Sequence, residues 1–170
     1  MNLEQWVRDV PDFPIQGILF KDITPLLQDP RALREAMERL AAPYLERGIE
    51  RVVAIESRGF IFGVPIACRL NAGFAPVRKA GKLPSETIGI EYSLEYGSNR
   101  LEMHRDAIVP GQKVLIVDDL LATGGSAAAA VELVEQLGGV IEGLAFLVEL
   151  ESLRGRERLA RFDVFSVLQV

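Results

Sequence analysis

Hydrophobic residues in this chain form two alternating patterns, short continuous runs and longer stretches with helical spacing. The continuous runs predict buried strands over residues 51–55, 73–77, 113–117, 142–150 and 163–168. The helical spacing predicts helices over residues 30–47, 60–71 and 125–137. Strands that alternate with helices indicate βαβ units. We therefore expect an α/β fold with a mainly parallel, twisted sheet flanked by helices.

The first thirty residues follow neither pattern. A short helix is predicted over residues 3–9. Pro11, Pro14 and Gly17 then interrupt a loop that carries exposed-looking apolar side chains. The next helix has a good start at Asp29-Pro30, with the aspartate as N-cap and the proline at the first helical position.

A second irregular region precedes the strand predicted over 113–117. Residues 78–86 form a basic loop, and apolar residues then alternate with others over 88–96 and again over 101–103. The turn Gly97-Ser98-Asn99 separates the two alternating stretches. Alternation on both sides of a turn predicts a β-hairpin.

Composition limits the functions open to such a chain. It has 170 residues, 49% hydrophobic and 25% charged, so we expect a single globular domain over residues 1–170. Nineteen Lys and Arg against 24 Asp and Glu give a net charge of −5. That balance argues against a general nucleic-acid binder, which needs a basic face. It is compatible with a local anion site.

Rare residues exclude further classes of protein. Cys68 is the one cysteine and His104 the one histidine, which rules out an internal disulfide, multi-cysteine metal sites and a zinc site with two histidines. We expect Cys68 to be a small buried core residue. The N-terminus has no apolar signal-type stretch, and the longest uncharged run, residues 120–131, is too short to cross a bilayer. These features predict a soluble, cytoplasmic protein.

The most informative segment is 114–126, which consists of four apolar residues, two aspartates, two leucines and an Ala-Thr-Gly-Gly-Ser turn that opens a helix. Free N–H groups and the dipole at a helix start favour an anion, and Gly124 and Gly125 let it approach closely. The lysine of a nucleoside-triphosphate P-loop is missing. Asp118 and Asp119 would repel phosphate, yet they suit a ligand that also presents vicinal hydroxyls, as ribose does. Each feature alone also fits an ordinary strand–turn–helix junction.

The whole segment resembles the phosphoribosyl-pyrophosphate (PRPP) motif of type I phosphoribosyltransferases. Four more stretches match that family in order, and they favour its adenine-specific members: residues 13–27, 56–60, 78–84 and 91–97. The resemblance covers nearly the whole chain, and it implies a small hood formed by the N-terminal segment and a lid formed by the predicted β-hairpin. It implies that the chain, with Mg²⁺, transfers the phosphoribosyl group of PRPP to N9 of adenine, giving AMP and pyrophosphate. This purine-salvage reaction passes through an oxocarbenium-like state.

The resemblance also implies which residues bind PRPP. The 5-phosphate is assigned to Ala122, Thr123, Gly124, Gly125 and Ser126. The ribose is assigned to Asp118 and Asp119. The pyrophosphate is assigned to Ser57, Arg58, Arg78, Lys79 and Lys82. Taken alone, the basic residues also fit a solvated surface. Mg²⁺ is expected to be held mainly by PRPP oxygens and water, so no side-chain metal ligands are predicted.

Two features of the family concern backbone and assembly. A non-proline cis peptide, frequent in the family, would fall at Glu56–Ser57. The family's arginine at the position of Arg78 reaches into the neighbouring subunit's site, which implies a homodimer whose Arg78 acts in trans.

The remaining implied roles are catalytic and purine-binding. Glu95, near the tip of the hairpin lid, would lie near N7 of adenine and manage a proton as N9 attacks. Tyr96 would shield the ribosyl cation. Arg58 is the second implied catalytic residue, because it would donate hydrogen bonds to the leaving pyrophosphate. Adenine is assigned to Leu19, Phe20 and Lys21. The Phe20 ring would stack on the purine while its neighbours' main chain reads the base edge.

Lys21 departs from the family, which usually has arginine there. A lysine is harmless if only its carbonyl contacts adenine. If its side chain supports the loop, the affinity for the base would fall.

Two alternatives stay open from the sequence. A phosphoribosyltransferase for xanthine or another purine shares the PRPP motif. A PRPP-sensing transcription regulator shares the fold, although it carries an added DNA-binding domain and a basic surface, whereas this chain is acidic.

Overall fold

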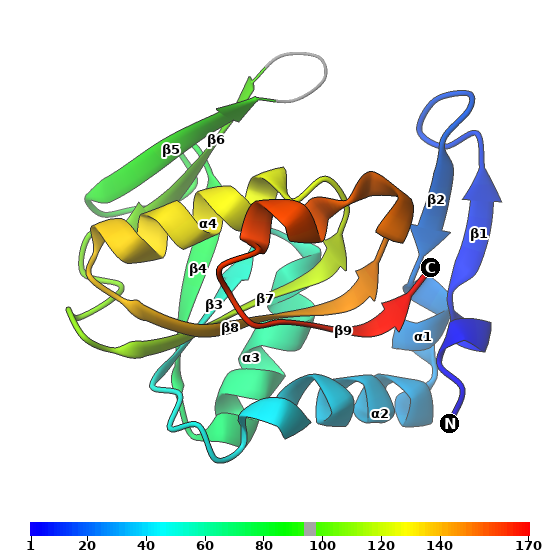
Figure 1. Ribbon diagram of the computed structural model, residues 1–170, viewed down its shortest axis with the longest axis horizontal. Coiled ribbons are helices and arrows are strands. Elements are labelled where there is room, and N and C mark those ends of the chain that lie inside the picture. The colour runs from blue at the N-terminus through cyan, green and yellow to red at the C-terminus, as the bar shows by residue number, and fades with distance from the viewer. Residues whose placement is uncertain (94–97) are drawn as a thin grey trace. The chain divides into compact units, whose positions relative to one another are not determined.

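The computed structural model describes residues 1–93 and 98–170, and it divides into two units, Met1–Arg39 and Leu40–Val170. The larger unit contains a seven-stranded sheet and the smaller unit a two-stranded antiparallel sheet. Figure 1 shows the elements with their labels.

The sheet of the larger unit is mainly parallel, as predicted. Its strands are β3 (Arg51–Ile55), β4 (Gly73–Lys79), β5 (Thr87–Ser93), β6 (Ser98–His104), β7 (Lys113–Leu121), β8 (Val140–Glu149) and β9 (Val164–Gln169). Their spatial order is β5-β6-β4-β3-β7-β8-β9. The strands β4, β3, β7, β8 and β9 are parallel, and the predicted hairpin β5–β6 joins β4 in antiparallel fashion.

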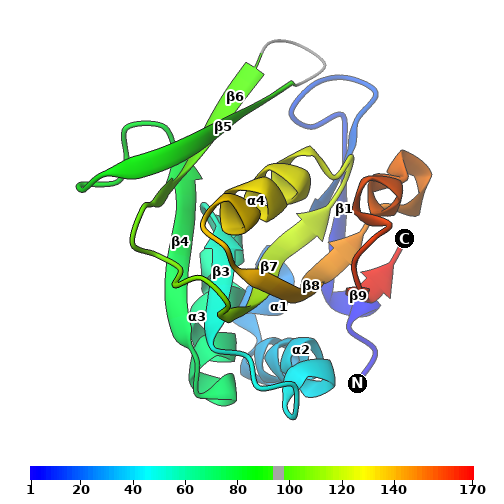
Figure 2. The ribbon, with the colours of Figure 1, turned by 60° about the vertical axis from the view of Figure 1, so that its left-hand side comes forward.

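Two helices of the larger unit lie on opposite faces of the sheet (Figures 1 and 2). Helix α3 (Arg58–Leu70) connects β3 to β4, and α4 (Gly125–Gln136) connects β7 to β8. The two connections run outward in opposite directions from the central pair β3 and β7. In open α/β sheets a ligand binds at the carboxyl ends of the strands where the winding reverses in this way.

The central strands carry continuous apolar runs, residues 52–55 in β3 and 114–117 in β7, because helices cover both faces of the sheet there. Residues Val52 and Val53 of β3 and Val114 and Val117 of β7 are completely buried. Three short 3-10 helices complete the larger unit: η2 (Ala42–Tyr44), η3 (Glu151–Leu153) and η4 (Gly155–Leu159).

The smaller unit differs from the sequence prediction. The expected helix over 3–9 is only the 3-10 turn η1 (Glu4–Trp6), and a hairpin follows, with β1 (Arg8–Pro11) and β2 (Leu19–Asp22). Ion pairs hold its strands together: Arg8 Nη2 lies 2.6 Å from Asp22 Oδ2 and Lys21 Nζ lies 2.7 Å from Asp9 Oδ1. Cross-strand pairs of opposite charge stabilise a hairpin without leaving an apolar alternation in the sequence.

The connecting loop of this hairpin carries exposed apolar side chains, as expected. Phe13 is 50% exposed and Ile15 is 61% exposed. The ring of Phe13 meets that of Phe20 edge to face, at a centroid distance of 5.1 Å.

Two helices follow the hairpin, α1 (Thr24–Gln28) and α2 (Pro30–Ala41). The predicted cap of α2 is confirmed, because Asp29 Oδ1 accepts hydrogen bonds from the N–H groups of Arg31 and Ala32, each at 2.9 Å. Helix α2 ends at residue 41 rather than 47. Pro43 explains the early end, since it has no N–H to continue the α-helical hydrogen bonds, and the chain goes on as the 3-10 helix η2.

The prediction that Cys68 is buried is wrong. Its side chain is exposed on α3, on the same side as the exposed residues Ile61 and Val64. The sequence could not predict this exposed stripe, because α3 has apolar residues on its exposed side as well as on its buried side. Within residues 1–93 and 98–170, no helix is long and apolar enough to cross a membrane.

Candidate functional site

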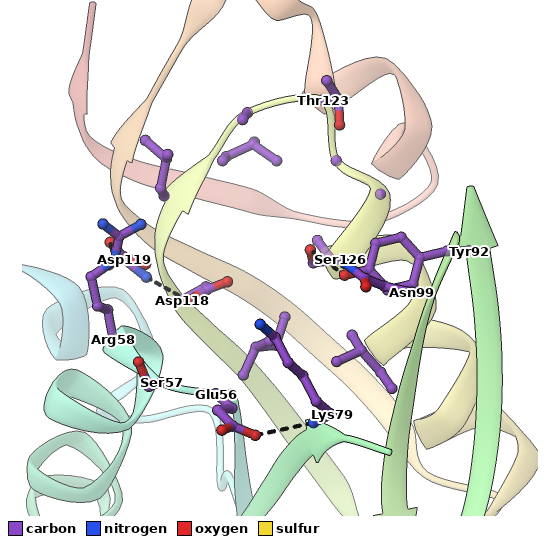
Figure 3. Close-up of a pocket in the computed structure, with 18 residues that line it drawn as sticks. Glu56, Ser57, Arg58, Lys79, Tyr92, Asn99, Asp118, Asp119, Thr123 and Ser126 are labelled. Atoms are coloured by element: carbon purple, nitrogen blue, oxygen red, sulfur yellow. Dashed lines mark hydrogen bonds and ion pairs between the residues drawn. The ribbon is translucent and has the colours of Figure 1, made fainter. Parts of the chain in front are cut away.

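A cavity of about 320 Å³ lies at the carboxyl ends of β3 and β7, where the winding of the sheet reverses. It is lined by residues 55–58, 79, 92, 99, 101 and 118–127. Figure 3 shows the segment after β3 on one side of it, the hairpin residues Tyr92 and Asn99 on the other, and the loop after β7 between them. The structure thus joins the predicted phosphate loop, both aspartates and part of the predicted pyrophosphate site.

The loop Ala122–Ser126 has the backbone needed to bind an anion. Gly124 adopts a positive φ of 81°, a conformation that glycine takes at no steric cost, and α4 begins at the next residue. No side chain of the described residues caps this helix. Its first N–H groups have no intrahelical partner, so they are available to a ligand in the cavity.

Asp118 and Asp119 lie at the end of β7, beside this loop. Asp119 is only 5% exposed, and Arg58 Nε lies 2.8 Å from its Oδ2. The backbone N–H of Asp119 donates to Asp118 Oδ1 at 2.9 Å. Burial and then the charge of Asp119 raise the pKa of Asp118, and burial raises the pKa of Asp119 although Arg58 opposes it.

The close approach of α3 to these aspartates depends on Gly59. A Cβ at this position would lie 2.7 Å from Asp118 Oδ1 and 3.2 Å from the carbonyl oxygen of Val117. Glycine therefore lets the start of α3 bring Arg58 to the carboxylate pair.

The expected non-proline cis peptide is present at Glu56–Ser57. The Glu56 carboxylate accepts the backbone N–H of Lys79 at 3.0 Å and faces two cations, with Arg78 Nε at 3.3 Å and Lys82 Nζ at 3.7 Å. Burial alone would raise the pKa of Glu56, but the Lys79 N–H and the Arg78 guanidinium outweigh it and lower the pKa. Carboxylate and cations thus neutralise one another beside the cavity.

The basic cluster is therefore divided. Lys79 lines the cavity and its side chain points into it (Figure 3). Arg78 and Lys82 do not line the cavity, and Arg78 also donates to the carbonyl oxygen of Lys82 at 3.2 Å.

Tyr92 and Asn99 line the cavity but were not among the predicted site residues. They face each other in the register of the β5–β6 hairpin, and the Ser126 hydroxyl donates to the Tyr92 hydroxyl at 3.5 Å. The predicted hairpin could have indicated that Tyr92 and Asn99 lie together, because opposed residues of a hairpin point to the same side of the sheet.

Other predicted residues lie elsewhere. Glu95 and Tyr96 fall outside the described residues. Leu19, Phe20 and Lys21 all lie on β2 of the smaller unit. The Lys21 side chain is engaged with Asp9 of β1, so it does support the hairpin.

Comparisons with known proteins agree with the geometry of the cavity. Residues 24–168 match the model of the phosphoribosyl transferase domain. The adenine phosphoribosyltransferase of Roseiflexus sp. (strain RS-1) is 57% identical over 168 residues, which are 99% of this chain and 98% of the relative.

Solved structures give the same result. The crystal structure of adenine phosphoribosyltransferase from Rhodothermus marinus has a TM-score of 0.94 at 56% identity and covers 99% of this chain and 96% of its own. The Saccharomyces cerevisiae enzyme of that name, solved with an imino-altritol bisphosphate and adenine, has a TM-score of 0.91 at 44% identity, with 97% and 96% covered.

Proposed function

This chain belongs to the phosphoribosyl transferase family, and from that premise we propose that it transfers the 5-phosphoribosyl group of PRPP to N9 of adenine. The products are AMP and pyrophosphate, and the reaction salvages adenine. The observation that carries the proposal is one cavity that joins the open start of α4 to the pair Asp118 and Asp119. A 5-phosphorylated ribose presents the anion and the vicinal hydroxyls that such a cavity accommodates.

The chemistry needs positioning and charge balance more than covalent catalysis. The bond from the ribosyl carbon to N9 forms as the bond to the pyrophosphate oxygen breaks, and the electron pair leaves with pyrophosphate. The amides at the start of α4, with the hydroxyls of Thr123 and Ser126, hold the 5-phosphate. Asp118 and Asp119 accept hydrogen bonds from the ribose hydroxyls and fix the sugar for attack.

The leaving pyrophosphate requires cations and donors. Ser57 and Lys79 line the cavity and serve this role, and Arg58 bridges from Asp119 to the pyrophosphate. Lys82 acts from beside Glu56, and Arg78, which Glu56 also orients, acts on the pyrophosphate of the neighbouring subunit's site.

Mg²⁺ fits this donor set as a partner of the substrate. Within the described residues, no group of three His, Cys, Asp or Glu side chains could hold a metal ion by itself. Asp118 and Asp119 would contact it through water, and PRPP oxygens would supply the other ligands. When bound, Mg²⁺ neutralises the charge of the phosphates.

The purine is bound by Leu19, Phe20 and Lys21, with the Phe20 ring stacked on the base. Glu95 acts as the general base for the proton at N7 as N9 attacks. In this proposal residues 1–170 act as one catalytic domain. The cytoplasmic compartment stays a prediction from the sequence.

The protein is also proposed to be a homodimer with Arg78 acting in trans. The exposed apolar stripe of α3, with Ile61 and Val64, supports a partner surface. Mixing Arg78→Ala with Glu95→Leu subunits should partly restore AMP synthesis. No recovery despite subunit exchange would contradict the role in trans.

The decisive experiment is to incubate the chain with PRPP, Mg²⁺ and each of adenine, hypoxanthine, guanine and xanthine. We expect AMP and pyrophosphate from adenine alone. Turnover of only the oxo-purines would assign the chain to another purine. Binding of DNA without any AMP synthesis would favour a regulator instead.

A further inference from the structure

The phosphate loop is backed by a segment that no role described above includes, the start of η4. A Cβ at Gly155 would lie 2.2 Å from the carbonyl oxygen of Ala122 and 2.9 Å from the backbone nitrogen of Gly124. Conversely, a Cβ at Gly124 would lie 2.6 Å from the carbonyl oxygen of Gly155. Contacts under 3 Å with backbone atoms cannot be relieved by rotating a side chain. The two backbones therefore fix each other's position.

The residue after Gly155 anchors this segment to the sheet. Arg156 forms a two-pronged ion pair with Glu149, the last residue of β8, and its Nη1 donates to the carbonyl oxygen of Val164 at 2.6 Å. Ser166 of β9 also donates to Glu149 Oε2 at 2.6 Å. Arg156 thus joins η4 to the ends of two strands.

Glu149 makes this anchor rigid. It is only 5% exposed, and its carboxylate receives Arg156, Ser166 and the Gln169 amide at 3.4 Å. A two-pronged arginine–carboxylate pair fixes geometry as well as charge. A buried carboxylate that loses its arginine is left with an uncompensated charge.

We propose that Gly155 and Arg156 are positioning residues for phosphate binding. Arg156, held by Glu149, fixes the Gly155 backbone, which in turn holds residues 122–124 in the shape that presents the N–H groups of α4 to the 5-phosphate. Neither residue lines the cavity. The inference rests on the proposed function for the identity of the substrate, although the anion site itself can be tested without it.

The experiment compares Gly155→Ala, Arg156→Met and Arg156→Lys in the full chain. Its matched control is Gly139→Ala, at the opposite end of the parallel strands, where an added Cβ would lie 2.6 Å from Val134 Cγ1. Calorimetry measures the binding of inorganic phosphate. The rate of AMP formation gives kcat, KM for PRPP and KM for adenine. Thermal unfolding gives Tm.

Misplacing one or two donors to a charged phosphate should weaken phosphate binding and raise KM for PRPP by about tenfold to a hundredfold. This is expected for Gly155→Ala and Arg156→Met. The KM for adenine should stay within about twofold, because lost phosphate donors touch no part of the base. Arg156→Lys should lie between Arg156→Met and the wild type, since lysine keeps the charge but not the two-pronged geometry. Gly139→Ala should lower Tm without changing phosphate affinity.

Wild-type phosphate affinity in folded Gly155→Ala and Arg156→Met would overturn the proposal. An equal loss in Gly139→Ala would also overturn it, because general destabilisation would then be the cause. If Arg156→Met does not fold, Arg156→Gln combined with Glu149→Gln removes both charges and carries the same expectation.

The two proposals fail in different ways. A wild-type chain that binds phosphate but makes no AMP would refute the proposed function and leave the phosphate measurement to decide the roles of Gly155 and Arg156. Variants that make AMP with an unchanged KM for PRPP would refute positioning and leave the proposed function intact.

Discussion

Replacing Asp118 by asparagine should make the protein more stable and a poorer enzyme. Two adjacent carboxylates share the end of β7, and Arg58 forms its ion pair with Asp119, at 2.8 Å. The pKa of Asp118 is raised well above 3.8 by burial and by the charge of Asp119. The asparagine would remove one of the two charges, keep the acceptor for the Asp119 N–H and add a donor that faces a carboxylate.

The size of both effects follows from that exchange. A net hydrogen bond to a charged group contributes about 1.5–3 kcal/mol. For a chain of 150–250 residues, each 1 kcal/mol raises Tm by about 2–4 °C, so the variant should melt roughly 3–12 °C higher at pH 8. The same 1.5–3 kcal/mol, lost from a ribose hydroxyl, should raise KM for PRPP by about tenfold to a hundredfold.

The pH dependence separates this explanation from general stabilisation. Between pH 3.8 and its raised folded pKa, Asp118 binds more protons in the native state than in the unfolded chain. Native stability in the wild type therefore gains from this group as the pH falls through that window. The advantage of the Asp118→Asn variant should be largest at pH 8 and should shrink towards pH 4.

The assay is thermal unfolding from pH 8 to pH 4, together with AMP formation at varied PRPP. Asp106→Asn is the control, because it changes net charge equally at an exposed position outside the cavity. A variant less stable than the wild type at pH 8, or a Tm difference that is the same at both ends of the range, would refute the electrostatic reasoning. An unchanged KM for PRPP would refute the ribose role.

Three further substitutions test other parts of the molecule. Gly59→Ala places a Cβ 2.7 Å from the nearest aspartate oxygen, so it should lower stability by about 1–3 kcal/mol and raise KM for PRPP, measured by unfolding and AMP formation. Lys21→Ala removes the 2.7 Å ion pair to the neighbouring strand and should raise KM for adenine severalfold; an equal rise in KM for PRPP would contradict a local effect. Thr24 and then Arg8 lower the pKa of Asp22 to about 2, so Asp22 contributes stability above pH 3.8 that is lost as the pH falls through about 2. Asp22→Asn should lower stability by about 1 kcal/mol at pH 7, as for a solvent-screened pair, and its Tm deficit should fade in acid; a constant deficit would be inconsistent with this role.

The central strands could be predicted because burial on both faces makes them continuous apolar runs. The ends of these strands could not be predicted from the sequence. The apolar run of β7 stops at Val117, yet the strand continues to Leu121 because β8 lies beside it and Asp118 pairs in register with Phe146. The neighbouring strand, not the local sequence, decides that both aspartates are held on a strand and not on a flexible turn.

The loop before α4, which is the proposed phosphate loop, could be predicted because its signal is local: glycines, hydroxyls and a helix start in consecutive positions. The contacts that hold it in place are between distant residues. Arg58 meets Asp119, and Arg156 meets Glu149 and Val164, through side chains whose partners no spacing rule specifies. The hairpin of the smaller unit was missed for the same reason, since its ion pairs appear only once its two strands are opposed.

Three cations near the cavity are already paired with carboxylates, although the proposed substrate is highly anionic. Arg58 lies against Asp119, and Arg78 and Lys82 lie against Glu56, so these groups bring little net charge to the site. In the proposed site, the 5-phosphate would be bound by backbone N–H groups that carry only the partial charge of a helix start. In the proposed site, a ribose hydroxyl would satisfy Asp119 and would let the Arg58 guanidinium turn part of its donors towards pyrophosphate. The sugar and the leaving group would then be recognised together, so we expect the site to favour PRPP over free phosphate or pyrophosphate.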